Sequence, residues 1–136
     1  MNSKIITRML EDELYESTDE HQHLARIDMR KGDAKTGLSP TQQLLAALAA
    51  CGAVDIVGML KKRRKNIQSF IIETNGTRRD EAPKYFTKIH CKYSITSPDV
   101  TEDELTKAAA LALEKYCSVA SSLKSEITFS VEVIRN

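Results

Sequence analysis

One segment limits the folds open to this chain more than any other: the run SPTQQLLAALAACGAVDIVGMLKKRRK, residues 39–65. Ser39 suits the N-cap, a proline follows at the first helical position, and Gln42 completes a capping box with Ser39. Between residues 44 and 60 the only charged side chain is Asp55. A helix that is apolar on every side must be covered on every side. The segment therefore predicts a long buried central helix, and the difficulty of covering it with so short a chain favours a homodimer.

The rest of the chain alternates between strand-like and helix-like patterns. Residues 4–30 show the two-residue period of strands around the polar turn ESTDEHQ, and further strands are expected at NIQSFIIETN, YFTKIHCKYSIT and EITFSVEVI. A second capping box, Thr101 with Glu104, opens an alanine-rich helix expected to run into Cys117, with a short helix after it. Strands grouped around two substantial helices predict an α+β fold with antiparallel sheets.

Length and composition narrow the class of protein. The 136 residues suit a single domain, 1–136, made of a strand arm 1–38, the central helix 39–65 and a strand–strand–helix–strand part 66–136. A hydrophobic share of 41% and a charged share of 29% are typical of soluble globular proteins, and the net charge of +1 gives no reason to expect nucleic acid or membrane as partner. We find no apolar run approaching the roughly 18 residues of a bilayer span and no signal-peptide pattern, so we expect a cytoplasmic protein.

Two groups of side chains could suggest other functions. His21 and His23 have the alternate spacing of metal ligands on a strand, but no third ligand is near, which favours a solvated turn. The basic run 61–65 could contact phosphates, but it also suits the negative end of a helix dipole and no aromatic platform accompanies it. We therefore expect no metal, no cofactor and no nucleic-acid partner.

Three cysteines remain as candidates for chemistry. An odd number of widely spaced cysteines fits neither a secreted disulfide framework nor a zinc site, so a reducing compartment is expected. Cys91 lies on the apolar face of a predicted strand, between Ile89 and Tyr93, where burial makes a thiol inert. Cys51 and Cys117 instead lie among small side chains, in LAALAACGAV and KYCSVASS, which would let another group approach. From the residues alone, a redox pair and two ordinary core cysteines both stay open.

The motif SPTQQLLAALAACGAVDIVGML, followed by EKYCSVASSL about sixty residues later, resembles the OsmC/Ohr family of osmotically inducible and organic hydroperoxide resistance proteins. The likeness extends over almost the whole chain. It implies an intertwined homodimer with each central helix buried between sheets and two active sites at the subunit interface. It also implies that Cys51 is the peroxidatic thiol and Cys117 the resolving one, with a hydroperoxide as substrate and a lipoyl-type or other small dithiol as reductant.

The resemblance has one departure near the expected site. Active family members hold an arginine of the N-terminal arm near the thiol with a glutamate one residue after the helix-opening proline, and this chain has Thr41 there. Both Arg26 and Arg30 suit the arginine, and distance to the helix favours Arg30. Asp55, one turn after Cys51, would raise the pKa of that thiol unless it is paired.

These observations predict a thiol-dependent peroxidase that reduces organic hydroperoxides in oxidative-stress defence. The alternative is a non-catalytic protein of the same fold that binds a small apolar or thiol-reactive ligand at the dimer interface.

Overall fold

The computed structural model describes all 136 residues and has the mixed α+β composition expected from the sequence. The chain divides into two compact units, Met1–Leu44 and Leu45–Asn136. Helix α1 (Pro40–Lys62) begins in the first unit and continues in the second. The single domain spanning 1–136 stays a prediction.

The first unit is a three-stranded antiparallel sheet of β1 (Ile6–Glu11), β2 (Leu14–Thr18) and β3 (Leu24–Asp28), in that order, followed by the short 3-10 turn η1 (Gly32–Ala34). The prediction of a turn at ESTDEHQ was wrong for its first half, because Glu16 lies inside β2. Glu16 pairs in register with Arg8 and Arg26 on the two neighbouring strands and forms ion pairs with both. Opposite charges across a sheet stabilise it, which explains how a polar segment forms a strand.

The second unit contains a sheet of β4 (Ser69–Arg78), β5 (Phe86–Thr96) and β6 (Glu126–Ile134), in that order. Strands β4 and β5 are antiparallel, whereas β5 and β6 are parallel. The prediction of antiparallel pairing was therefore wrong for β5 and β6. The chain passes from β5 to β6 through helix α2 (Glu102–Leu111), a crossover connection of the kind that parallel neighbours require.

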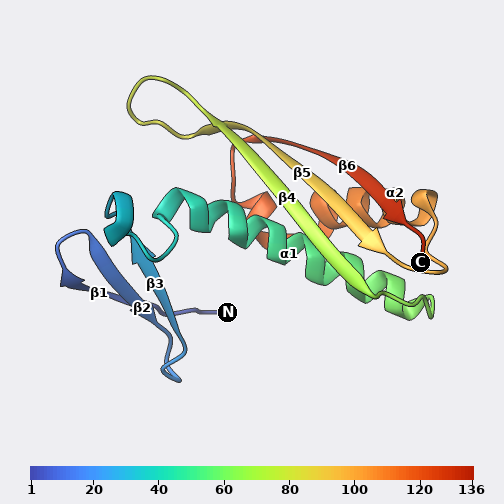
Figure 1. Cartoon of the computed structure of the whole chain (residues 1–136), viewed down its shortest axis with the longest axis horizontal. Helices are drawn as coiled ribbons and strands as arrows, with labels where there is room; N and C mark the ends of the chain where they lie inside the picture. The colour runs from blue at the N-terminus through green and yellow to red at the C-terminus, as the bar shows by residue number, and fades with distance from the viewer. The chain divides into compact units, whose positions relative to one another are not determined.

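Both helices of the second unit lie on one face of its sheet (Figure 1). The alternation predicted for β5 is confirmed, since its buried residues occupy every second position toward the helices: Ile89, Cys91, Tyr93 and Ile95. Helix α1 contributes a matching stripe at helical spacing: Leu48, Gly52, Ile56 and Leu60. The core of this unit therefore lies between α1, α2 and the central strand.

The predicted start of α1 is confirmed in detail. The Gln42 N–H donates to Ser39 Oγ over 3.4 Å, and Gln42 Oε1 accepts from the Ser39 N–H over 2.9 Å. The helix ends at Lys62, because Arg64 adopts a left-handed conformation with φ 61°. Within one chain only one face of α1 is buried, and Val54 is 71% exposed on another.

Helix α1 is also long and apolar enough to cross a membrane by length and composition, so the expectation that no segment approaches this length was wrong by that measure. Core helices of water-soluble proteins satisfy the same criterion. Here the stripe from Leu48 to Leu60 packs inside the second unit.

Candidate functional site

Cys51 lies in the middle of α1 and is half-buried. The next residue, Gly52, belongs to the stripe that α1 buries. Cys51 is therefore held on a rigid element at the edge of a packed face, where the residue is partly accessible.

Cys117 follows an irregular end of the second helix. After α2 the chain forms a π-helical turn, η2 (Ala112–Tyr116), in which the Cys117 N–H donates to the Ala112 carbonyl over 2.7 Å. Cys117 itself is extended, and the four-residue helix α3 (Ser118–Ser121) comes next. The capping box of Thr101 and Glu104 is confirmed, but the single helix expected to reach Cys117 is interrupted. Turns of this kind are frequent at functional sites.

The two thiols lie near each other within one chain. Burial raises the pKa of Cys117, and the neighbouring Cys51 thiol raises it further. The Ala120 N–H, which donates to Cys117 Sγ over 3.4 Å, acts in the opposite direction. Both cysteines are free thiols. The structure thus brings together two sulfurs that lie 66 positions apart (117 − 51) in the sequence.

The two thiols differ in accessibility. Cys117 is 1% exposed, whereas Cys51 is only half-buried. The raised pKa keeps the proton on Cys117 at neutral pH. This asymmetry suits a pair in which an external oxidant reaches Cys51 and the internal thiol of Cys117 then closes a disulfide.

Cys91 is the third thiol and lies in the sheet. It is fully buried on β5, and burial raises its pKa. The hydroxyls of Tyr93 and Thr74 lower that pKa in part. A buried thiol with no cation beside it is inert, which agrees with the prediction from the sequence.

Tyr93 is the site residue that the sequence did not single out. It is fully buried, and its hydroxyl has no hydrogen-bond partner of normal geometry. A Cβ atom on Gly52 would lie 3.0 Å from this hydroxyl, so glycine leaves room for the phenol beside Cys51. The glycine directly after Cys51 was the one signal in the sequence that another group approaches the helix here. It did not indicate that this group is the Tyr93 hydroxyl.

The structure places both candidate arginines in ion pairs of the first unit. Arg30 donates to both carboxylate oxygens of buried Asp28, at 3.0 and 2.9 Å, and to Glu11 at 3.0 Å. The Arg30 guanidinium and the Thr36 N–H hold the pKa of Asp28 far below its usual range. Arg26 lies 3.4 Å from Glu16, which Arg8 also contacts.

The net charges of these two clusters differ. One guanidinium meets two carboxylates around Arg30, whereas two guanidiniums share one carboxylate around Glu16. The Arg26 side chain is also more open, at 55% exposed against 21% for Arg30. Uncompensated positive charge therefore resides with Arg26 and Arg8.

Two further positions on α1 were singled out in the sequence. Thr41 is half-buried and carries no charge. Asp55, one turn after Cys51, is half-buried and forms no ion pair. The neighbouring Gln42 is occupied, since its amide oxygen accepts from the Ser39 N–H and the Lys35 ammonium.

The features set aside in the sequence form ion pairs of their own. His23 pairs with Asp19 over 2.7 Å in the turn between β2 and β3. In the basic run, Lys65 and Arg63 contact Glu104 of α2 at 3.2 and 3.9 Å. These ion pairs connect the chain after the end of α1 to the start of α2.

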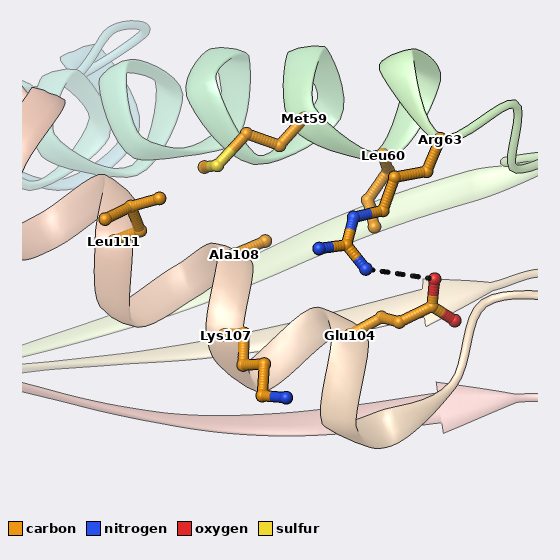
Figure 2. Close-up of a pocket in the computed structure, with 7 residues that line it drawn as sticks. All are labelled: Met59, Leu60, Arg63, Glu104, Lys107, Ala108 and Leu111. Atoms are coloured by element: carbon orange, nitrogen blue, oxygen red, sulfur yellow. Dashed lines mark ion pairs between the residues drawn. The ribbon is translucent and has the colours of Figure 1, made fainter.

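One pocket lies between α1 and α2 (Figure 2). Apolar side chains line it and charged ones stand at one end, in the set Met59, Leu60, Arg63, Glu104, Lys107, Ala108 and Leu111. Met59 is eight residues beyond Cys51, about 12 Å along a helix. No cysteine lines this pocket, so it is separate from the thiol pair.

Comparisons with known proteins agree with this architecture. The family model described as OsmC-like protein matches residues 32–132. Protein YhfA of Escherichia coli strain K12 is 37% identical over 123 residues, which is 89% of each chain. The structure of a hypothetical protein from Aquifex aeolicus VF5 is similar with a TM-score of 0.88 and 26% identity, over 100% of this chain and 98% of that one. The organic hydroperoxide resistance protein OhrB of Bacillus subtilis has a TM-score of 0.62 and 20% identity, over 98% of both chains.

Proposed function

Because the chain belongs to the OsmC-like protein family, we propose that it is a thiol-dependent peroxidase that reduces organic hydroperoxides through Cys51 and Cys117. The observation that carries this proposal is the proximity of a half-buried thiol to a fully buried one inside a single chain. The name of the structurally similar OhrB supports the substrate class.

The proposed reaction has two steps on the protein. The Cys51 thiolate attacks the terminal oxygen of the hydroperoxide, the O–O bond breaks, and the alcohol leaves after taking up a proton. Cys51 is then a sulfenic acid. The Cys117 sulfur attacks the Cys51 sulfur, an S–S bond forms, and the hydroxyl leaves with the Cys117 proton as water. An external dithiol reduces the disulfide by two exchange steps, and its two sulfurs become oxidised in turn.

The resting state must keep the thiols reduced. All three cysteines are free in the structure. A reducing compartment such as the cytoplasm maintains that state between turnovers. A lipoyl-type or other small dithiol fits the need for a reductant able to reach a half-buried sulfur.

The proposal keeps Arg30 as the activating cation, as the resemblance to the family implies, with Arg26 as the alternative. A nearby positive charge favours a thiolate. Arg30→Gln should therefore slow oxidation of Cys51 about tenfold, and Arg26→Gln is the matched control, expected to change this rate less. The reverse order would assign the cation to Arg26.

The proposed active form is a homodimer. Helix α1 exposes a second apolar stripe at helical spacing that its own chain leaves uncovered: Ala46, Ala47, Ala50, Val54 and Gly58. Small side chains let two helices approach closely. Strand β1 adds exposed Ile6 and Met9. Exposed apolar surface on this scale is typical of a subunit interface.

Steady-state peroxide consumption tests the function. The full-length protein, cumene hydroperoxide and dihydrolipoamide are mixed, and hydroperoxide loss is followed with Cys51→Ser as the matched control. We expect turnover in the wild type and background rates in the variant. Turnover no faster than that of free cysteine would contradict the peroxidase and favour a protein of the same fold that binds a small apolar or thiol-reactive ligand.

A further inference from the structure

The Tyr93 hydroxyl is a buried polar group without an obvious reason. The side chain is fully buried on the central strand, and the oxygen has no hydrogen-bond partner of normal geometry among the protein's groups. The thiol of Cys91, on the same face of β5, interacts with it, but sulfur is a weak acceptor. Buried tyrosine hydroxyls usually have a partner, so this one requires an explanation.

The hydroxyl points at the part of α1 that carries Cys51. An added Cβ at Gly52, the residue after Cys51, would be 3.0 Å from the Tyr93 oxygen. The charge of Cys117 also raises the pKa of Tyr93. The Tyr93 hydroxyl therefore lies against α1 at Gly52, the residue after Cys51, and in the neighbourhood of Cys117.

The Tyr93 ring is held firmly in this orientation. Its centroid lies 5.9 Å from that of Phe70 on β4 and 6.3 Å from that of Phe129 on β6. Burial, with the nearby cysteines, raises its pKa, so the phenol keeps its proton at neutral pH. It is thus a fixed hydrogen-bond donor whose one nearby acceptor is the weak one of the Cys91 sulfur.

We propose that the Tyr93 hydroxyl donates a hydrogen bond to the oxygen that a hydroperoxide leaves on Cys51, and so positions the sulfenic acid for attack by Cys117. This inference rests on the proposed function. In the step concerned, the Cys117–Cys51 S–S bond forms, the Cys51 S–O bond breaks, and water leaves with the Cys117 proton. Tyr93 keeps its own proton throughout and stabilises the departing oxygen as charge builds on it.

This role explains why the donor is unpaired before reaction. A donor already paired with a protein acceptor would have to break that bond before it could bind the new oxygen. Gly52 leaves room for the hydroxyl beside α1, since any larger residue would place its Cβ against that oxygen. In the peroxide step the departing oxygen is the one bound to the organic group, whereas in the second step it is the one bound to Cys51, so a donor to the latter oxygen acts chiefly on the second step.

Tyr93→Phe tests the inference, since it removes one oxygen and keeps the ring among Phe70 and Phe129. Reduced protein is mixed with one equivalent of cumene hydroperoxide, and sulfenic acid, trapped with dimedone, and disulfide are followed by mass spectrometry. We expect oxidation of Cys51 to stay within about twofold of wild type and disulfide formation to slow about tenfold, the loss expected for one buried hydrogen bond. Sulfenic and sulfinic acid should accumulate as a result.

Thr74→Val is the matched control, because Thr74 carries the other buried hydroxyl without a partner and lies beside Cys91. It should leave both steps unchanged. Tyr93→Phe should not lower the thermal midpoint, because no normal hydrogen bond is lost. Equal disulfide rates in wild type and Tyr93→Phe, equal slowing of both steps, or a slow step in Thr74→Val would each overturn the inference. A wild type that forms no disulfide would instead overturn the proposed function.

Discussion

Gly52→Ala measures the contact between helix α1 and the phenol of the central strand. The new Cβ would lie 3.0 Å from the Tyr93 oxygen but 3.8 Å from Leu113 Cδ2 and 4.0 Å from Tyr93 Cζ, so the hydroxyl alone is too close. Alanine in a helix interior is better than glycine by about 0.5–1 kcal/mol. Overpacking a core costs about 1–3 kcal/mol. The overpacking cost minus the helix gain predicts that the free energy of unfolding falls by about 1 kcal/mol, within a range from near zero to about 2.5 kcal/mol.

The same substitution in the Tyr93→Phe background isolates the cause. Without the oxygen, the new Cβ meets only contacts of ordinary length, and Gly52→Ala should then stabilise the protein by about 0.5–1 kcal/mol. The coupling between the two sites should be about 1–3 kcal/mol.

Urea unfolding of the four proteins, followed by circular dichroism at one fixed protein concentration, gives the four free energies of unfolding. A Gly52→Ala effect that is the same in both backgrounds would refute the close approach of the Tyr93 hydroxyl to α1. The inference about the thiol pair would then lose its geometric basis.

Three further perturbations test other parts of the structure. Asp28→Asn should destabilise the protein at neutral pH, and the difference from wild type should shrink in acid. The reason is that Arg30 lowers the pKa of the Asp28 carboxyl, so its contribution to stability is complete above the ordinary aspartate pKa near 3.8 and declines as the pH falls from there toward the lowered pKa. Urea unfolding from pH 7 to pH 3 measures the start of this decline. Asp55→Asn should speed Cys51 oxidation about twofold by removing a like charge one turn away, as measured by stopped-flow mixing with peroxide, and a slower variant would give Asp55 a positive role. Val54→Glu should convert a dimer into monomers in analytical ultracentrifugation, and an unchanged mass would contradict an interface on this face of α1.

Local patterns predicted the elements well where the responsible contacts are near in sequence. The capping boxes at Ser39 and Thr101 form as expected, because each joins residues three positions apart. The alternation in β5 correctly placed Cys91 in the core, because one face of that strand is buried.

Features that depend on distant partners were not readable. Glu16 forms part of a strand because Arg8 and Arg26 flank it from two other strands. The parallel pairing of β6 depends on the path of the crossover, which no pattern within β6 encodes.

The candidate site shows the same division between local and distant contacts. The two cysteine motifs were visible in the sequence, but the meeting of Cys51 with Cys117 and the Tyr93 hydroxyl at Gly52 depend on how α1 crosses the sheet. The acceptors of Arg30 come from separate segments and were not readable either, and its assignment as the activating cation stays a prediction.

The central claim is that the sulfurs of Cys51 and Cys117 form one redox pair. Fully reduced protein is treated with one equivalent of cumene hydroperoxide, digested without reductant and mapped by mass spectrometry. The account predicts a peptide pair joined through Cys51 and Cys117, with the mass of the intact chain lower by two hydrogen atoms. An unmodified protein, or a disulfide that involves Cys91, would contradict it.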